Sequence, residues 1–273
     1  MPRAQSNGIE LEWDDFGSTS DPPLLLIMGF SAQMIAWDER FCQQIADEGF
    51  HVIRFDNRDV GLSSRVTEPA YTLDDMADDA AGLLDALGID KAHIVGASMG
   101  GMIAQLFAIR HPQKTLSLCS IMSTTGNPEV GQATPEAIEA LLQPRPTTRE
   151  EAIERGEQVG RIISSKTLFD ADKARRNAAI AFDRANDPDG VARQLQAIMA
   201  QTARESDLAN VKVPTLVIHG KGDPLVTLSG GEATAKAIPG AELLVLDEMG
   251  HDLPEPLWPE IVGAIVKNAR SAS

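Results

Sequence analysis

The sequence predicts an α/β protein with a doubly wound, mostly parallel sheet and an all-helical insertion. Short apolar runs alternate with helical patterns at both ends of the chain, and this alternation is typical of strands joined by crossover helices. The alternation stops in the middle of the chain, where only helical patterns are found. We therefore predict a core formed by residues 1–124 and 206–273, with residues 125–205 inserted as a helical lid.

Strands are predicted from their apolar patterns. Ile9, Leu11 and Trp13 alternate with polar residues, which indicates a half-buried strand. The continuous apolar run at residues 24–28 indicates a strand that is buried on both faces. The other predicted strands cover residues 51–55, 92–95, 115–122, 213–219 and 242–246.

Helices are predicted where apolar residues recur every three or four positions. Trp37, Phe41 and Ile45 have this spacing. Thr72, followed three residues later by Asp75, predicts the start of a second helix. Further core helices are predicted at residues 99–109, at 232–238 and from about 255. Four helices are predicted in the insertion, starting near residues 134, 147, 170 and 187, each at a capping residue or an early proline.

Composition and charge exclude several classes of function. The net charge of −16 at pH 7 opposes binding to nucleic acid and to anionic membranes. No apolar run approaches the roughly 20 residues that span a bilayer, and the first residues lack the apolar stretch of a secretion signal. Cys42 and Cys119 both lie in apolar segments, so we expect no disulfide scaffold and a cytoplasmic protein.

An acidic cluster on the second predicted helix is interpreted as a solvated face, not as a metal site. Aspartates at neighbouring helix positions point in different directions, which does not suit a shared cation. The cluster consists of Asp74, Asp75, Asp78, Asp79 and Asp85.

The pentapeptide Gly-Ala-Ser-Met-Gly at residues 96–100 lies where a predicted strand passes into a predicted helix. Glycines in a G-x-S-x-G turn let the chain reverse sharply and let a substrate carbonyl approach the serine. The helix that begins there also offers unpaired N–H groups and the positive end of its dipole. We predict that Ser98 is a nucleophile; the alternative is an ordinary tight turn.

A serine hydroxyl needs a general base to remove its proton. His251 lies in a glycine-flanked loop after the last predicted strand, at the same sheet edge as Ser98, and we predict that it is this base. His219 ends a strand at that edge and is the competing candidate. The other three histidines lie at the wrong ends of their elements: His51, His93 and His111.

The acid that orients the histidine is predicted to be Asp223. It lies in the loop Gly220–Pro224, after a strand that ends at the same edge. The resulting order Ser98, Asp223, His251 is the order expected for this architecture. Some sheets of this kind carry the acid one strand earlier, but residues 122–125 contain none. The alternative for Asp223 is a simple Asp-Pro turn.

An oxyanion hole is predicted from the backbone N–H groups of Phe30 and Met99, with Gly29 permitting the turn. Adaptable methionine side chains near the inferred site suggest an apolar pocket, although they could simply fill gaps in the core. The predicted pocket residues are Gly29, Met34, Met122 and Met249.

No lysine or arginine immediately flanks Ser98, so we expect neutral, apolar substrates. An anionic substrate would lose hydration without gaining a cation, and it would approach against the overall negative charge. A clamp formed only on folding is the alternative, supplied by Arg58, Lys221 or a lid arginine such as Arg161.

Together these residues resemble the α/β-hydrolase superfamily over nearly the whole chain. Residues 55–63 are similar to the D-x-R-G-x-G-x-S segment of that family, and residues 213–220 to the strand before its acid. The resemblance implies structural roles for Asp56, Arg58 and Ser63. The sequence has Met28 where many relatives have histidine, and Asp59 where they have glycine. These features are most similar to the branch of small carboxylesterases that contains aclacinomycin methylesterase.

The resemblance implies a serine esterase that cleaves carboxylic esters of neutral, apolar substrates through an acyl-enzyme, with no metal or cofactor. Haloalkane dehalogenases and epoxide hydrolases of the superfamily use an aspartate nucleophile, so Ser98 excludes those reactions. The alternatives are a C–C bond hydrolase or a cofactor-free perhydrolase or haloperoxidase on the same residues, and a non-catalytic receptor for a small ligand. The expected partner is a small-molecule ester, and the sequence leaves a homo-oligomer open.

Overall fold

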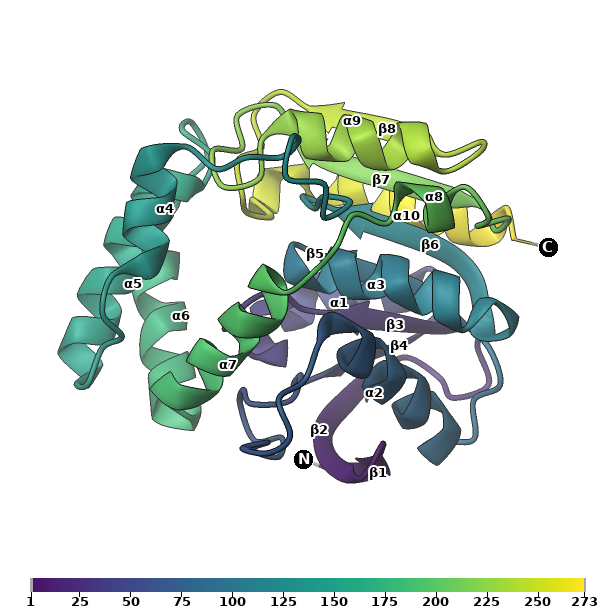
Figure 1. Ribbon diagram of the computed structural model, residues 1–273, viewed down its shortest axis with the longest axis horizontal. Coiled ribbons are helices and arrows are strands. Elements are labelled where there is room, and N and C mark those ends of the chain that lie inside the picture. The colour runs from purple at the N-terminus through teal and green to yellow at the C-terminus, as the bar shows by residue number, and fades with distance from the viewer. Residues whose placement is uncertain (1, 273) are drawn as a thin grey trace.

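A computed structural model describes residues 2–272 and has an eight-stranded sheet at its centre (Figure 1). The strand order is β1-β2-β4-β3-β5-β6-β7-β8. Strands β3 to β8 pair in parallel, whereas β1 pairs antiparallel with β2, and β2 with β4. The predicted doubly wound, mostly parallel sheet is confirmed. The strands are β1 (Arg3–Ser6), β2 (Ile9–Phe16), β3 (Pro23–Ile27), β4 (His51–Phe55), β5 (Ala92–Ala97), β6 (Thr115–Ile121), β7 (Thr215–Gly220) and β8 (Glu242–Leu246).

Helices cover both faces of this sheet (Figure 1). They are α1 (Glu39–Asp47), α2 (Leu73–Ala86), α3 (Met99–Arg110), α8 (Glu205–Leu208), α9 (Leu228–Ala237) and α10 (Trp258–Arg270), with 3₁₀ turns at Met34–Ala36, Pro112–Lys114 and Glu255–Leu257. Thr72 caps α2 in a capping box with Asp75, as the sequence indicates. Trp37, predicted within a helix, instead lies before α1 and stacks on Phe41 with ring centroids 5.7 Å apart. Among residues 2–272, none of these helices is long and apolar enough to cross a membrane.

Strand β3 shows how the apolar sequence forms two cores. Leu25 and Ile27 belong to the cluster under α2 and α3, whereas Leu24 and Leu26 belong to the cluster under α1 and α10. All four side chains are completely buried. Because neighbouring strand residues point to opposite faces, one continuous apolar run supplies both cores.

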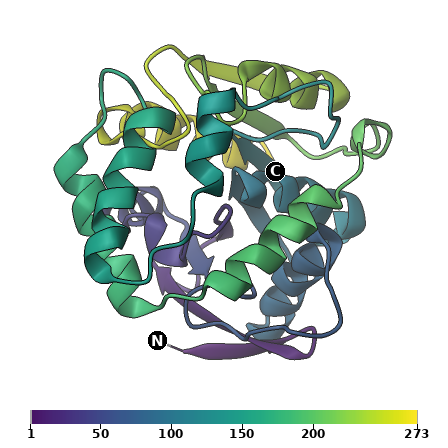
Figure 2. The same ribbon diagram turned by 60° about the vertical axis from the view of Figure 1, so that its left-hand side comes forward.

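Between β6 and β7 the described chain forms helices only. Besides α8, which packs on the sheet, they are α4 (Pro135–Leu142), α5 (Arg149–Ile163), α6 (Ala171–Arg184) and α7 (Pro188–Met199). Side chains of Thr134, Thr148, Asp170 and Asp187 cap their first turns. Figure 2 shows this group, here called the helical insertion, beside one end of the sheet. Its polar contacts are with loops that follow β3, β4 and β8, so it lies at the carboxyl ends of the parallel strands.

The acidic cluster on α2 is only partly a solvated face. Asp79 is buried and accepts hydrogen bonds from Arg58 at 2.6 and 2.7 Å. The interpretation was wrong for this residue because its carboxylate is buried against the Arg58 guanidinium, which is itself buried. No group of three or more His, Cys, Asp or Glu side chains within residues 2–272 could hold a metal ion. Cys42 and Cys119 are both free and buried.

Helix α3 packs closely on the sheet because glycines lie at the contact. A Cβ atom added to Gly100 would come within 2.1 Å of the carbonyl oxygen of Ile27 in β3. A Cβ added to Gly96 would come within 2.0 Å of the Gly100 carbonyl oxygen. The start of α3 can therefore approach β3 and β5 only without side chains at these two positions.

We expect Gly100→Ala to lower the free energy of unfolding by about 1–3 kcal/mol, because the added methyl group must push backbone atoms apart. Gly263→Ala in α10 is the matched control, since nothing lies within 4 Å of its added Cβ. It should raise stability by about 0.5–1 kcal/mol, as alanine is the better helix former. Urea denaturation measures both variants, and equal stability of the two would contradict this packing.

Candidate active site

Ser98 lies at the sharp turn between β5 and α3. Its backbone has φ +57° and ψ −122°, a conformation that is unfavourable for a residue with a side chain. The turn is held by neighbouring elements: Ser98 N–H donates to the Ile121 carbonyl at 2.9 Å, and the Ser98 carbonyl accepts from Ser123 Oγ at 2.9 Å. The fixed backbone therefore lifts the hydroxyl above the carboxyl edge of the sheet.

His251 lies between this hydroxyl and the carboxylate of Asp223. His251 Nε2 lies 2.9 Å from Ser98 Oγ, and His251 Nδ1 lies 2.7 Å from Asp223 Oδ2. The other oxygen of Asp223 accepts from the N–H groups of Leu225 and Val226 at 2.8 and 2.9 Å. Because these two bonds fix the carboxylate, its free oxygen is aimed at the imidazole. With the proton on Nδ1, Nε2 can accept the serine proton.

The competing histidine, His219, does not reach Ser98. It is fully buried at the end of β7, and its Nε2 bonds to the Val226 carbonyl at 2.8 Å. Burial lowers its pKa, so it is neutral at pH 7. The remaining histidines have partners away from the site: His51 with Asp15, His93 with Ser117, and His111 with Asp78.

The two predicted oxyanion donors are free to receive a ligand. Within the described chain, neither Phe30 N–H nor Met99 N–H has a protein acceptor. Gly29 brings the loop after β3 against the serine, because a Cβ there would come within 2.9 Å of Ser98 Cβ. The next residue of this loop, Ser31, donates its N–H to Gln194 Oε1 of the helical insertion at 3.0 Å.

A cavity of about 1280 Å³ opens beside these residues. Ser98 and His251 are not among its lining residues, but Met28, Met122 and Asp252, close to them in the chain or the sheet, are. Of the predicted pocket residues only Met122 lines it; Gly29, Met34 and Met249 do not. Met34 and Met249 are almost completely buried in the interior. Aromatic rings contribute much of the wall: Trp37, Phe41, Phe169, Phe182 and Trp258.

The cation candidates named from the sequence have other partners. Arg58 pairs with Asp79, Lys221 with Asp247, and Arg161 with Glu157, and none of the three lines the cavity.

A different cation, Arg145, lines the cavity and lies over the ring of Phe30, 5.2 Å from its centroid. A cation of the helical insertion therefore lies at the cavity wall, as the alternative of a clamp formed on folding allows, but it is not one of the residues named from the sequence. Sequence reasoning missed this residue because the contact joins segments more than a hundred positions apart. Its one local signal is the sequence Pro144-Arg145-Pro146, in which the prolines restrict the backbone.

Comparisons with known proteins agree with this fold. The model of a family described as alpha/beta hydrolase fold matches residues 22–255. Rhodomycin D methylesterase DauP of Streptomyces sp. (strain C5) is 31% identical over 96% of this chain and 95% of its own. A 2-hydroxy-6-oxononadienedioate/2-hydroxy-6-oxononatrienedioate hydrolase of Burkholderia vietnamiensis is 27% identical, over 89% of this chain and 85% of its own.

Among solved structures, the enol-lactonase from Burkholderia xenovorans LB400 is similar with a TM-score of 0.81 and 25% identity. The alignment covers 98% of this chain and all of the lactonase. The family match extends from β3 to the turn that follows His251, and thus includes Ser98, Asp223 and His251. The chain belongs to the alpha/beta hydrolase fold family.

Proposed function

We propose that this protein is a serine hydrolase that cleaves carboxylic esters through an acyl-enzyme. The observation that carries the proposal is the continuous hydrogen-bonded chain from Ser98 Oγ through His251 to Asp223, at 2.9 and 2.7 Å. The family match supports a hydrolase, and the methylesterase relative supports an ester as the substrate class.

In the first half-reaction, Ser98 Oγ attacks the ester carbonyl carbon while His251 Nε2 takes the hydroxyl proton. The carbonyl oxygen becomes an oxyanion, which accepts hydrogen bonds from Phe30 N–H and Met99 N–H. His251 then gives its proton to the leaving alkoxide as the ester C–O bond breaks. The alcohol departs and an acyl-serine remains.

In the second half-reaction, water replaces the alcohol. His251 removes a proton from the water as its oxygen attacks the acyl carbon, and returns a proton to Ser98 Oγ when the acyl–serine bond breaks. Asp223 stabilises the imidazolium in both halves, because its carboxylate lies 2.7 Å from Nδ1. Each proton that leaves an oxygen is returned to one, so the cycle needs no metal or cofactor.

The cavity supports a substrate with a bulky apolar part. Its volume of about 1280 Å³ exceeds the roughly 300–1,000 Å³ of common ligand pockets, and its wall carries aromatic rings. Each methylene of a substrate buried there contributes about 0.8 kcal/mol to binding. The acyl or alcohol group is therefore expected to bind mainly by hydrophobic contact.

A second candidate is hydrolysis of a C–C bond next to a ketone, by the same residues. It is favoured by the similarity to the 2-hydroxy-6-oxononadienedioate hydrolase. Assays with a panel of neutral esters and with a meta-cleavage diketone separate the two candidates. Turnover of the diketone but of no ester would replace the proposal, and tight binding without turnover of either would indicate a receptor.

We expect Ser98→Ala to abolish ester turnover while the protein stays folded, because only the bond-forming oxygen is removed. Residual activity from the oxyanion donors should remain only about 10³–10⁴-fold above the rate in water. Circular dichroism checks the fold. A fluorophosphonate should label wild-type protein at Ser98, as shown by peptide mass spectrometry; labelling at Ser63 or Ser123 instead would overturn the assignment.

Asp223→Asn should reduce kcat much more than Asp252→Asn, by up to ~10⁴-fold, because an amide stabilises the wrong imidazole tautomer. Asp252 is a matched control: it adjoins His251 and is half-buried, but its carboxylate accepts from the N–H groups of Ser165 and Gly250. Steady-state kinetics with one ester measure kcat of both variants and of the wild type. Similar losses in the two variants would place the orienting acid elsewhere.

A further inference from the structure

Arg145 lies in the connection between α4 and α5, at the wall of the cavity. Its guanidinium carbon is 5.2 Å from the centroid of the Phe30 ring, and Nη1 lies 3.5 Å from Ser31 Oγ. Phe30 and Ser31 belong to the loop that packs against Ser98. The cation therefore contacts two side chains of the loop whose Phe30 N–H is the proposed oxyanion donor.

Most other cations of this wall have carboxylate partners. Arg40 pairs with Asp38 and Glu255, Arg54 with Asp14, and Lys173 with Asp38. In the part of the chain that the structure describes, Arg145 forms no ion pair. Its charge faces the cavity without a counter-ion.

A second cation adds to this excess of positive charge. Arg155 also lines the cavity, has no ion pair within residues 2–272, and donates Nη2 to the Leu141 carbonyl at 3.0 Å. Burial and the charge of Arg155 lower the pKa of Arg145 to about 10, which still leaves it charged at pH 7. Two partly buried cations without an anion are unfavourable, and a bound anion would relieve both the desolvation and the repulsion.

The shape of the Arg145 guanidinium indicates which anion it can bind. The contact with Phe30 is a cation–π contact, and the one hydrogen bond of the guanidinium is the long one from Nη1 to Ser31 Oγ, so most of its N–H donors remain available. Those donors match the two oxygens of a carboxylate in a bidentate pair. The neighbouring aromatic wall would take the apolar part of the same molecule.

From these contacts we infer that Arg145 is a specificity-determining residue that binds a carboxylate carried by the substrate. The inference rests on the proposed ester hydrolysis and names its substrate class: esters with an apolar body and one free carboxylate away from the scissile bond. It replaces the expectation of wholly neutral substrates, because folding brings a cation to the site that local sequence does not.

The test compares two esters of the same shape. Mono-p-nitrophenyl glutarate carries a terminal carboxylate, and p-nitrophenyl 5-methylhexanoate carries an isopropyl group of similar shape in place of that carboxylate. The readout is the ratio of kcat/KM for the glutarate to kcat/KM for the hexanoate. We expect Arg145→Met to lower this ratio at least tenfold, mainly through KM of the glutarate. Arg145→Lys should give an intermediate ratio, because it keeps the charge but loses the planar fork.

Arg175→Met is the matched control. Arg175 is on α6, is absent from the cavity wall and pairs with Glu157, so its loss removes the same charge from the same helical insertion. Its ratio should equal that of the wild type. A folded Arg145→Met protein whose ratio changes less than threefold, or an equal fall in Arg175→Met, would overturn the inference.

Failure of the proposed function is detected separately. If the wild type hydrolyses neither ester, ester hydrolysis is wrong, and Arg145 is then tested by calorimetry on the Ser98→Ala protein. The probes are 4-phenylbutyrate and the neutral 4-phenylbutyramide. Preference for the anion that disappears when Arg145→Met is added supports the carboxylate site; equal affinity for both probes overturns it.

Discussion

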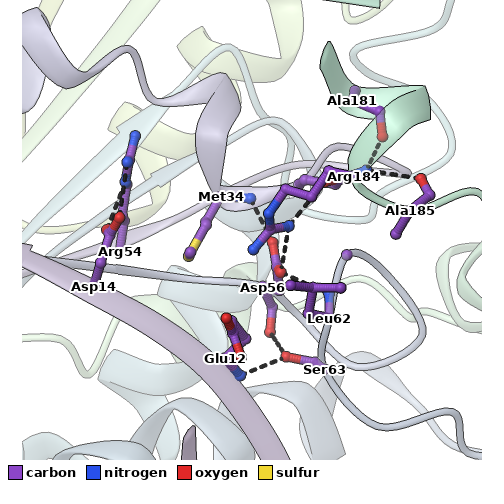
Figure 3. Close-up of polar contacts among 12 residues, drawn as sticks. Glu12, Asp14, Met34, Arg54, Asp56, Leu62, Ser63, Ala181, Arg184 and Ala185 are labelled. Atoms are coloured by element: carbon purple, nitrogen blue, oxygen red, sulfur yellow. Dashed lines mark hydrogen bonds and ion pairs between the residues drawn. The ribbon is translucent and has the colours of Figure 1, made fainter. Parts of the chain in front are cut away.

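The carboxylate of Asp56 holds together the three segments on which the site depends. It is completely buried and accepts from Met34 N–H at 2.7 Å and Leu62 N–H at 2.9 Å, and it pairs with Arg184 at 2.7 Å (Figure 3). Burial raises its pKa, while these partners favour its charged form. A buried carboxylate left without its partners costs several kcal/mol. This constraint fixes the loop after β3, the loop after β4 and helix α6 relative to one another.

Further polar contacts extend this attachment around the helical insertion. Gln33, in the loop after β3, donates to the carbonyls of Ala181 and Ala185 at the end of α6. Asp59, in the loop after β4, accepts two hydrogen bonds from Arg193 of α7, each at 2.8 Å. Because the loop after β3 also packs against Ser98, these bonds connect the helical insertion to the reacting groups.

Local sequence patterns are enough to infer the sheet. They are also enough to place Ser98, Asp223 and His251 at its edge. Apolar runs mark strands, and parallel strands bring their carboxyl ends to one edge. Strand β1 was missed since its residues, Arg3–Ser6, are mostly polar, although Asn7-Gly8 after it is a typical hairpin turn. Contacts between distant segments leave no such signal, so neither Arg145 over Phe30 nor the interior positions of Met34 and Met249 could be read from the sequence.

The hydrogen bond from His251 N–H to the Ile163 carbonyl, at 2.7 Å, joins the loop after β8 to the last residue of α5. This bond limits which replacements of the helical insertion the protein can accept. Replacing the helical insertion with that of a relative would alter the cavity wall, but any graft must present a backbone carbonyl at this point. A change of the helical insertion would therefore affect both the substrate range and the alignment of the imidazole. Exchanges that leave the end of α5 and its loop intact should preserve that alignment best.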